Sequence, residues 1–482
     1  MTIGQTFSMH IKNRSNHPAI ITEERSITYH ELYTSIHGMQ QHLLATFGKE
    51  KQRKIGIALG NSEAFIEVFF AVTMLGWIAI PFDSKWSQYE RTLVEQECQP
   101  DAVISGKCSL YPCKFETAPY SLEWHTDDEF LFYIGYTSGS TGKPKGFMRN
   151  HRSWVSSFQS VEKVFQLSKD DTFYVPGPLC HSLSLFAAVH AIHLGATLYV
   201  TKTFEPERVI RLVESEPISA MYVVPTMIHS IATVLSKKDK QLTNALTIIS
   251  SGAKCTPELK DQLKKQLPYS SLIEFYGASE LSFITYLSNE DGQKKPSSVG
   301  KPFPGVEIYL VDENQRNVSV GEIGTLCVKS PFVFSGYVNE PMATKDVFRG
   351  DVATVGDLAY QDEEGFITLV GREKNMIISG GLNIYPEEVE AVIQQVDEVD
   401  EVVVMSESDP YWGEKLVAIL KWKDGRNVSI DALKTHCRSE LSSFKCPRSF
   451  IEVKEFPYTS SGKIARKEVQ QLIRGEKSCE KQ

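Results

Sequence analysis

Short apolar runs alternate with longer segments of helical periodicity through much of the chain. The run Ile55–Leu59 is typical of a buried strand, the segment Glu63–Leu75 of a helix and the run Trp77–Pro81 of the next strand. A strand, a helix and a second strand at this spacing indicate parallel β-α-β units. The same alternation continues over residues 151–275. The pattern therefore predicts an α/β fold whose large N-terminal domain consists of layered α/β subdomains.

The second half of the chain has a different character. Beyond Gly300, short strands separated by turns predict a β-rich subdomain, and a compact α+β unit is expected from Asn375 onward. At 482 residues the chain exceeds the ~250–300 residues at which one core stops growing. We predict a large N-terminal domain over residues 1–371, a hinge over 372–374 and a small, mobile α+β C-terminal domain over 375–482.

Composition argues against several classes of protein. The formal net charge of −9 disfavours a dedicated nucleic-acid-binding protein. The nine cysteines are odd in number and include no Cys-x-x-Cys pair, which favours a reduced cytoplasmic protein and gives no support to a zinc site. The longest apolar region, residues 64–82, is interrupted by Glu67, Gly76 and Pro81, and the first residues lack a basic segment followed by an apolar core. We expect a cytoplasmic protein without a transmembrane segment or signal peptide.

The stretch Tyr136–Gly146 is unusually rich in glycine and hydroxyl residues. It follows the strand-like run Phe130–Ile134 and contains Lys143 and Lys145. Glycines let backbone N–H groups approach a phosphate, hydroxyls donate further hydrogen bonds, and the lysines add positive charge. A flexible linker is the alternative, but linkers do not carry two lysines around a proline just after a buried strand. The expected phosphate contacts here are Thr137, Ser138, Gly139, Ser140, Thr141, Gly142, Lys143 and Lys145.

This loop is not a Walker A motif. That motif needs a glycine where this chain has Thr137 and a serine or threonine where it has Pro144. A P-loop ATPase or kinase is therefore disfavoured, although it remains the alternative from another enzyme class. The stretch instead resembles the signature of the acyl-adenylating enzymes, which include acyl-CoA synthetases, luciferases and the adenylation domains of peptide synthetases.

Five later stretches resemble motifs of the same family and occur in the family's order. The first, Pro178–His181, resembles the segment that acyl-CoA synthetases place beside the substrate carboxylate. The resemblance implies that His181 is catalytic and lines the acyl pocket. Domains for α-amino acids usually carry Phe-Asp here, so an α-amino acid is not the expected substrate. A loop histidine without a catalytic part is the alternative.

Two further stretches resemble the family's nucleotide-binding and acyl-binding turns. Ser250–Lys254 resembles Gly-Gly-Ala-Pro, with Lys254 in place of the usual proline. Tyr276–Glu280 resembles Tyr-Gly-x-Thr-Glu, which implies that Tyr276 stacks on adenine and that Glu280 is a catalytic Mg²⁺ ligand. A carboxylate that caps a turn is the alternative for Glu280. The implied ATP contacts are Gly252, Ala253, Lys254, Glu274, Phe275, Tyr276, Gly277, Ala278 and Ser279, and Gly252 and Gly277 are also expected in the acyl pocket.

A fourth resemblance covers the region before the predicted hinge. Asp357 and Arg372 match the positions that the family uses to bind the ribose hydroxyls of ATP. The family usually has threonine before Gly-Asp, whereas this chain has Val355. Lys374 matches the family's hinge residue and is expected to take up the backbone change when the small domain turns.

The fourth stretch continues into the predicted C-terminal domain, and the fifth lies within that domain. The strand around Gly380 and Gly381 resembles the one that lines the tunnel for coenzyme A. Pro457–Arg466 resembles Pro-x-Thr-x-x-Gly-Lys-x-x-Arg, which implies that Lys463 contacts ATP and is the catalytic lysine of adenylation. A surface lysine is the alternative for Lys463. Because these motifs serve different half-reactions, the domain is expected to rotate between them.

Together the motifs imply an AMP-forming acid–thiol ligase. A carboxylic acid, expected to be a fatty or aryl acid, would react with ATP and Mg²⁺ to give acyl-AMP and pyrophosphate, and the thiol of coenzyme A would then give acyl-CoA and AMP. No carrier domain follows residue 482, which disfavours a multimodular peptide synthetase. A stand-alone enzyme that loads a separate acyl carrier protein is the near alternative. A non-catalytic nucleotide-binding protein is the alternative outside the enzymes.

Overall fold

The computed structural model describes residues 1–49, 52–106, 127–138, 144–379, 382–409, 413–459 and 463–479. Of these, residues up to 308 together with 328–353 form one compact unit, and residues 309–327 together with 354–479 form a second. The predicted domain boundary at residue 371 therefore lies within the second unit. Compactness alone does not locate a hinge, and the hinge over 372–374 stays a prediction.

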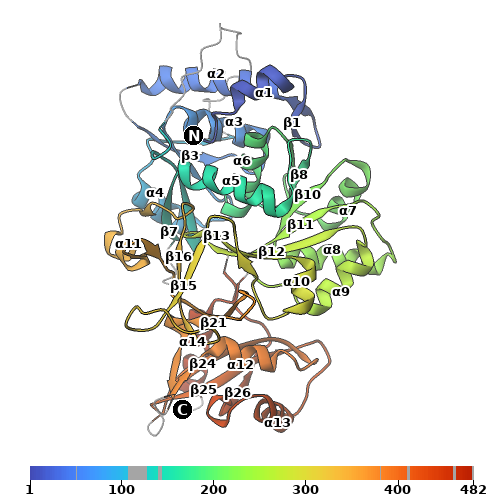
Figure 1. The fold of residues 1–482 in the computed structure, drawn as a ribbon, viewed down its shortest axis with the longest axis vertical. Coiled ribbons are helices and arrows are strands. Elements are labelled where there is room, and N and C mark those ends of the chain that lie inside the picture. The colour runs from blue at the N-terminus through green and yellow to red at the C-terminus, as the bar shows by residue number, and fades with distance from the viewer. Residues whose placement is uncertain are drawn as a thin grey trace. The chain divides into compact units, whose positions relative to one another are not determined.

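The first unit contains a long, mostly parallel sheet with the strand order β14-β13-β12-β11-β10-β8-β9-β1-β2 (Figure 1). Its strands from β12 to β1 run parallel, and antiparallel strands flank them at both edges. The strands are β1 Pro18–Ile21, β2 Ser26–Thr28, β8 Thr172–Val175, β9 Thr197–Val200, β10 Ala220–Val223, β11 Thr247–Ser250, β12 Ser271–Ala278, β13 Ser282–Leu287 and β14 Lys301–Pro302.

A second sheet of the same unit has the order β17-β7-β6-β4-β3-β5. Strands β5, β3, β4 and β6 run parallel, whereas β7 and β17 are antiparallel to their neighbours. The strands are β3 Lys54–Ala58, β4 Ile78–Pro81, β5 Ala102–Ser105, β6 Leu131–Ser138, β7 Pro144–Asn150 and β17 Gly336–Tyr337. These two sheets confirm the prediction of an α/β fold with parallel β-α-β units.

Most helices of the first unit begin with recognisable sequence signals. Thr28 and Glu31 form a capping box at the start of α2, Ser87 and Glu90 form one at the start of α4, and α7, α8 and α9 begin with proline. The helices are α1 Phe7–Arg14, α2 Tyr29–Phe47, α3 Glu63–Met74, α4 Gln88–Cys98, α5 His151–Phe165, α6 Ser182–Leu194, α7 Pro206–Ser215, α8 Pro225–Lys237, α9 Pro257–Gln266, α10 Asn289–Lys294 and α11 Pro341–Val347.

Helices α5 and α6 link the two sheets through aromatic side chains. Trp154 of α5 packs against Tyr133 of β6 with ring centroids 5.4 Å apart. Phe186 of α6 packs against Phe283 of β13 at 4.7 Å, and Trp154 and Phe186 contact each other at 5.3 Å. Figure 1 shows both helices between the strands of the two sheets. This buried layer fixes one sheet against the other, because aromatic pairs of this kind add packing energy to a large buried area.

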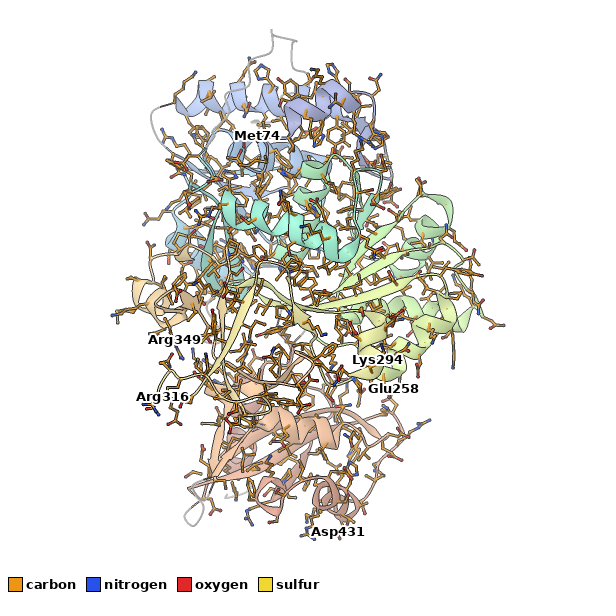
Figure 2. The ribbon with its side chains drawn as sticks, in the orientation of Figure 1. Met74, Glu258, Lys294, Arg316, Arg349 and Asp431 are labelled. Carbon is orange, nitrogen blue, oxygen red and sulfur yellow. The ribbon has the colours of Figure 1, made fainter. Side chains whose placement is uncertain are left out.

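Helix α3 is buried on nearly all sides, as expected of a helix whose sequence is mostly apolar, with Glu67 among its buried residues. At its end Met74 is 3% exposed, and a Cβ added to Gly4 would lie 2.6 Å from Met74 Cγ (Figure 2). By contrast, Glu258 and Lys294, also marked in Figure 2, are exposed on α9 and α10. The N-terminal segment is therefore part of the core, and Gly4 leaves room for Met74.

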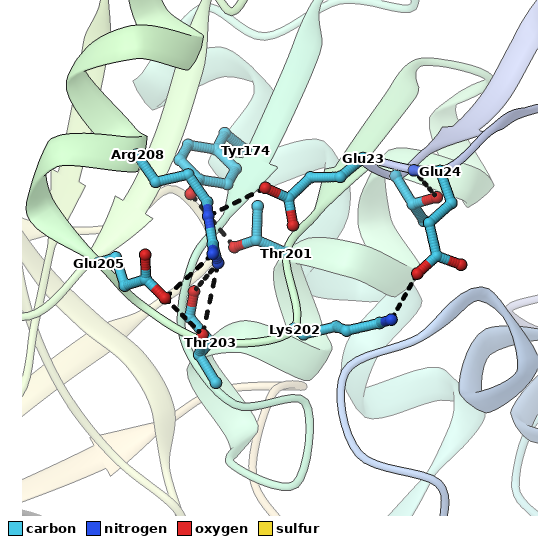
Figure 3. Close-up of polar contacts among 9 residues, drawn as sticks. Glu23, Glu24, Tyr174, Thr201, Lys202, Thr203, Glu205 and Arg208 are labelled. Atoms are coloured by element: carbon cyan, nitrogen blue, oxygen red, sulfur yellow. Dashed lines mark hydrogen bonds and ion pairs between the residues drawn. The ribbon is translucent and has the colours of Figure 1, made fainter.

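A polar cluster fastens the turn between β1 and β2 to the segment that leads into α7 (Figure 3). Arg208 pairs with Glu23 at 2.9 Å and with Glu205 at 3.0 Å, and Lys202 pairs with Glu24 at 2.5 Å. Exposed ion pairs contribute little individually. The cluster thus links the β1–β2 turn to the region of α7, while the buried layer contributes more of the stability of the unit.

The second unit combines antiparallel strands with an α+β layer. Strands β16, β20 and β21 pair antiparallel, and a further sheet has the order β23-β22-β25-β24 with β26 beside β25. Its apolar core includes Val389 and Ile393 of α12 and Leu433 of α13. The remaining elements of the chain are β15 Glu307–Val311, β16 Gly324–Lys329, β18 Phe348–Arg349, β19 Val352–Ala353, β20 Asp357–Gln361, β21 Ile367–Arg372, η1 Glu373–Asn375, β22 Ile377–Ser379, β23 Leu382–Ile384, α12 Pro386–Ile393, β24 Val399–Asp409, β25 Gly413–Trp422, α13 Ile430–Glu440, η2 Ser443–Lys445, β26 Ser449–Glu452 and α14 Arg466–Cys479.

None of the helices in the described parts of the chain is long and apolar enough to cross a membrane.

Candidate active site

Glu280 lies in the tight turn that joins β12 to β13. The N–H of Leu281 donates to the carbonyl of Ala278 at 3.1 Å, and Ser282 takes a left-handed conformation with φ of 62°. The chain passes so close to itself that a Cβ at Gly277 would lie 2.1 Å from the carbonyl oxygen of Ser282. Gly277, predicted to line the acyl pocket, is therefore required by the hairpin itself, and its pocket role stays a prediction.

The Glu280 carboxylate is held from outside its own turn. The hydroxyl of Tyr337 donates to Glu280 Oε1 at 2.6 Å, and the N–H of Phe334 donates to the Glu280 carbonyl at 2.8 Å. Tyr337 is fixed in turn, because it pairs with Phe147 of β7. The ammonium of Lys145 lies 3.4 Å from the centroid of the Tyr337 ring, a cation–π contact. Tyr337 thus joins the predicted metal ligand to the predicted phosphate-binding lysine.

A buried arginine supports the same turn. Arg149 of β7 is 2% exposed and donates hydrogen bonds to the carbonyls of Ser279, at 2.6 Å, and Phe332. Burial lowers the pKa of Arg149 to about 10, and the charge of Glu280 opposes that shift. Arg149 therefore stays charged at neutral pH. It connects the end of β12 to the strand that follows the predicted phosphate loop.

The predicted phosphate loop connects two antiparallel strands. Thr137 pairs with Lys145, and Ser138 pairs with Pro144, at the end of the β6–β7 hairpin that adjoins the loop. A Walker A loop connects a strand to a helix instead. The strand that follows the loop is a second reason against a P-loop enzyme. The predicted contacts Gly139, Ser140, Thr141, Gly142 and Lys143 lie outside the described residues.

The turn after β11 lies beside the end of β12, because Ser250 pairs with Glu274 in the parallel ladder. Ser251 Oγ donates to the carbonyl of Phe275 at 2.9 Å, which brings the predicted ATP contacts of the two segments together. Gly252 has φ of 96°, a conformation that residues with a side chain rarely adopt, although a Cβ there would find space. Replacing Gly252 would therefore strain the backbone besides filling a pocket.

Two charged residues of this region have structural partners. Glu274 is 8% exposed, accepts from the N–H of Cys255 at 2.7 Å and pairs with Lys260. Lys254, which replaces the family's proline, donates to the carbonyl of Ser298 at 2.8 Å. Burial, and then the charge of Lys260, lowers the pKa of Lys254 to about 8, with Glu274 opposing the shift. The hydrogen bond from the Lys254 ammonium to Ser298 thus holds the turn after β11 in place.

The predicted substrate histidine lies in the loop between β8 and α6. Asn61, from the loop after β3, holds this loop: its amide donates to the carbonyl of Gly177 at 2.8 Å, and its Oδ1 accepts from the N–H of Leu179 at 2.8 Å. His181 Nε2 lies 3.7 Å from Asp83 Oδ2. Burial lowers the pKa of His181, with Asp83 opposing, so the imidazole is neutral at physiological pH.

The second unit brings three predicted site residues together. Asp357 pairs with Arg372 at 2.6 Å, and the two are direct partners in the β20–β21 ladder. Burial of the ammonium lowers the pKa of Lys463, Arg372 lowers it further, and Asp357 opposes the shift. These influences place Lys463 near the Asp357–Arg372 pair even though the residue as a whole is exposed.

The remaining predictions concern the segment after β21. Lys374 is exposed within the short helix η1, directly after Arg372 and Glu373, as a hinge residue can be. Gly380 and Gly381 lie outside the described residues, between β22 and β23. Their roles stay predictions.

Three supporting residues escaped the sequence analysis. Tyr337 and Asn61 lie far along the chain from the groups that they hold, so nothing in their neighbourhood marks them. Arg149 did leave a signal, since it follows Phe147 and Met148 in a strand. A charge within an apolar strand is costly to bury and suggests a special environment.

Comparisons with known proteins agree with this architecture. The model of the AMP-binding enzyme family matches residues 7–338, and that of the AMP-binding enzyme C-terminal domain matches residues 388–463. The uncharacterized acyl-CoA ligase YhfT of Bacillus subtilis is 37% identical over 491 residues, with 98% of each chain covered. The putative long chain fatty acid-CoA ligase VraA of Staphylococcus epidermidis is 33% identical, with 95% of this chain and 96% of that one covered.

A solved enzyme shares the fold. The o-succinylbenzoate CoA synthetase MenE of Bacillus subtilis, in complex with ATP and a magnesium ion, has a TM-score of 0.86 at 25% identity, with 96% of this chain and 98% of that one covered. The same enzyme is also known in complex with its acyl-adenylate intermediate, with a TM-score of 0.84.

In the two-sheet α/β unit Tyr337 contacts both Glu280 and Lys145, and the second unit carries Lys463. Together with the family matches, these features define an AMP-forming acid–thiol ligase. The chain belongs to the AMP-binding enzyme family. This membership confirms the resemblance to acyl-adenylating enzymes that the motifs indicated.

Proposed function

We propose that the chain activates a carboxylic acid with ATP to give acyl-AMP and pyrophosphate, and then transfers the acyl group to coenzyme A. The products of the full reaction are acyl-CoA, AMP and pyrophosphate. The observation that carries the proposal is the arrangement of Glu280, Tyr337 and Lys145, in which a carboxylate and an ammonium contact the same tyrosine. A fixed anion beside a fixed cation suits a metal–phosphate group, whose two parts need opposite charges.

The surroundings of Glu280 suit Mg²⁺. The ion prefers oxygen ligands and often joins one carboxylate to a phosphate. Tyr337 engages Oε1, and among the described residues Oε2 accepts no hydrogen bond, so an oxygen remains for an ion. When bound, Mg²⁺ offsets the negative charge of the phosphate oxygens. Tyr337 and Arg149 hold the turn in place, and Lys145 adds a second positive group for the phosphates.

The second unit supplies the other groups of the proposed reaction. Asp357 accepts hydrogen bonds through its carboxylate, which suits the vicinal hydroxyls of a ribose. Lys463 would stabilise the charge that develops on the α-phosphate during adenylation, and a fixed donor of this kind acts most strongly where water is excluded. Arg372 pairs with Asp357 at 2.6 Å and orients its carboxylate.

We propose a fatty or aryl acid as the substrate, with His181 beside its carboxylate. The support for a fatty acid is the 33% identity to a relative named as a long chain fatty acid-CoA ligase. The support for an aryl acid is the similarity to the o-succinylbenzoate enzyme. A neutral His181 can donate a hydrogen bond to a carboxylate without pairing with it as a fixed charge.

The test uses the full-length protein with ATP, Mg²⁺ and a panel of fatty acids of rising chain length and aryl acids. Pyrophosphate release without coenzyme A reports adenylation, and thioester formation after coenzyme A is added reports transfer. We expect both with at least one acid of the panel. ATP binding without pyrophosphate release for any acid would overturn the proposal. Adenylation without a CoA thioester would move the acceptor to an acyl carrier protein.

A further inference from the structure

Three potential metal ligands of different chemistry meet beside the predicted acyl pocket. The carboxylate of Asp83, the thiol of Cys180 and the imidazole of His181 each offer one atom, and these atoms all lie within 4.8 Å of one another. Within the described residues this is the one group of three or more such side chains that comes so close. The ligands come from two segments about a hundred residues apart, so the spacing of cysteines along the chain cannot reveal the group.

The geometry of the group is set by the surrounding backbone. Asp83 follows the end of β4, and Cys180 and His181 lie between β8 and α6. Asn61 holds the loop through the N–H of Leu179. The N–H of Lys85 donates to Asp83 Oδ1 at 2.8 Å, which leaves Oδ2 directed toward His181 at 3.7 Å. Both ligating segments are thus fixed by hydrogen bonds that do not use the ligating atoms.

We propose that Asp83, Cys180 and His181 form a three-ligand site for a thiophilic divalent cation of the Zn²⁺ type. Zn²⁺ accepts cysteine sulfur, histidine nitrogen and carboxylate oxygen as ligands, and zinc sites with an open position commonly have three protein ligands. Zinc–ligand bonds of about 2.0–2.3 Å in a tetrahedron place the ligand atoms about 3.3–3.8 Å apart. For a nitrogen and an oxygen ligand this spacing is about 3.3–3.5 Å, so the 3.7 Å between His181 Nε2 and Asp83 Oδ2 would have to shorten by only a few tenths of an ångström.

The chemistry of binding also separates this site from the proposed magnesium site. Mg²⁺ prefers oxygen ligands alone, whereas thiolate and imidazole select Zn²⁺ and related ions. On binding, the S–H bond of Cys180 breaks, a metal–sulfur bond forms and the proton passes to solvent. No oxidant or reductant takes part.

The functional consequence rests on the proposed function of His181. A cation bound to the imidazole would occupy the position at which we propose that the acid carboxylate lies. Zinc should therefore inhibit adenylation by competing with the acid and not with ATP. The site would act as a brake on acid activation.

The binding test uses the full-length protein and Cd²⁺ alone, whose bond to a thiolate gives an ultraviolet charge-transfer band. One equivalent should produce the band in the parent, and Cys180→Ser should lose it. Cys446→Ser is the matched control, because Cys446 is also a half-buried free thiol but lies in the second unit. It should keep the band. A band that survives in Cys180→Ser, or a parent that binds no equivalent, overturns the proposal.

Zinc affinity, measured by competition with a chromophoric chelator, tests the other two ligands. Asp83→Asn and His181→Ala should each weaken binding by more than the roughly 10- to 100-fold that loss of an outer-sphere partner costs. Circular dichroism and thermal unfolding show whether each variant keeps its fold. Unchanged zinc affinity in both folded variants overturns the three-ligand site.

Inhibition is measured separately, with each variant compared to its own metal-free rate of pyrophosphate exchange. Zinc should raise the apparent KM for the acid in the parent, and Cys180→Ser should show less than a tenth of that effect. Equal inhibition of both proteins overturns the proposal that zinc bound at this site inhibits adenylation. If no acid of the panel is adenylated, the proposed function fails, whereas the cadmium and chelator measurements still decide the metal site.

Discussion

The turn around Glu280 and the segment around Lys463 hold their predicted catalytic residues in different ways. Tyr337 binds the Glu280 carboxylate, and Phe334 binds its carbonyl, so groups from a distant part of the sequence fix it. Lys463 is fixed through its backbone alone: its carbonyl accepts from the N–H of Thr459 at 2.7 Å. Among the described residues, its ammonium makes no hydrogen bond or ion pair.

This difference matches the tasks that we propose for the two residues. A carboxylate that binds an ion must keep its position, and the free-energy cost of ordering it is incurred once, during folding. A lysine that serves only adenylation gains from a side chain without a competing partner. The partly desolvated ammonium would then interact most strongly with the negative charge that develops on the α-phosphate during adenylation. The comparison predicts that changes at the two positions have separable effects.

The largest effect is expected for Lys463→Ala. Acyl-AMP formation should fall by roughly 100- to 1,000-fold, the loss that follows removal of one preorganised donor to a developing negative charge. Thioester formation from supplied acyl-AMP and coenzyme A should stay within a few-fold of the parent. Pyrophosphate exchange and thioester yield measure the two half-reactions. Lys467→Ala, a nearby exposed lysine on α14, is the control and should leave both unchanged.

If Lys463→Ala reduced both half-reactions equally, the proposed difference in role between Lys463 and Glu280 would be contradicted. The lysine would then support the fold or a step common to both reactions. A thermal unfolding measurement distinguishes these outcomes, because an exposed lysine without a partner should change the melting temperature very little.

The next effect is expected for Glu280→Gln, which removes a charged oxygen ligand but keeps the shape of the side chain. Adenylation should need a much higher Mg²⁺ concentration, by more than the roughly 10- to 100-fold cost of losing an outer-sphere partner. The Mg²⁺ dependence of pyrophosphate exchange measures the change. The fold should persist, since the glutamine oxygen can still accept from Tyr337. A parental Mg²⁺ dependence would remove Glu280 from the metal site.

The fold was largely predictable because its signals are local. The predicted helix Glu63–Leu75 matches α3, and the predicted strands Ile55–Leu59 and Trp77–Pro81 match β3 and β4, because the apolar patterns that indicate them lie within the elements themselves. The strand that follows the phosphate loop was not foreseen. The glycines and hydroxyls of that loop indicate phosphate chemistry, but nothing in them tells whether a helix or a strand comes next.

Only those site residues that lie within recognisable motifs could be predicted from the sequence. Glu280 and Lys463 stand in recognisable stretches, whereas Tyr337 meets Glu280 across 57 residues of sequence and Asn61 meets Leu179 across 118. Supporting contacts of this kind depend on how sheets pack, and no local pattern encodes them. The motif glycines also have a structural role, because the backbone conformation at Gly252 and the close backbone contact at Gly277 each require glycine.

A smaller effect is expected for Tyr337→Phe. The ring keeps its contact with Lys145, but the hydrogen bond to Glu280 is lost. The apparent Mg²⁺ affinity should fall by about 10-fold, at the lower end of outer-sphere effects, while the KM for the acid stays unchanged. Tyr337→Leu also removes the cation–π contact and should raise the KM for ATP. If Tyr337→Phe and Tyr337→Leu behave alike, the hydroxyl and the ring do not have separate roles.

The smallest effect concerns the pH dependence of adenylation. Burial lowers the pKa of Lys463 below the 10.5 of an unperturbed lysine. If adenylation uses the charged ammonium, as we propose, it should be lost as pH rises through a value below 10.5. Asp357 opposes this shift and Arg372 adds to it. Asp357→Asn should therefore move the alkaline limb of the pyrophosphate-exchange profile to lower pH, and Arg372→Gln should move it to higher pH. Each displacement should be less than about one pH unit, because water and salt screen exposed charges.

The position of that limb is informative even if both substitutions also weaken ATP binding, because weaker binding changes the height of the profile and not the pKa of Lys463. Saturating ATP keeps the two effects apart. In Lys463→Arg the guanidinium stays charged to far higher pH, so whatever activity remains should lose the alkaline limb. Displacements of the same sign in Asp357→Asn and Arg372→Gln, or a limb that persists in Lys463→Arg, would show that another group titrates. The alkaline limb would then not report the pKa of Lys463, and the proposed influence of Asp357 and Arg372 on its ammonium would be contradicted.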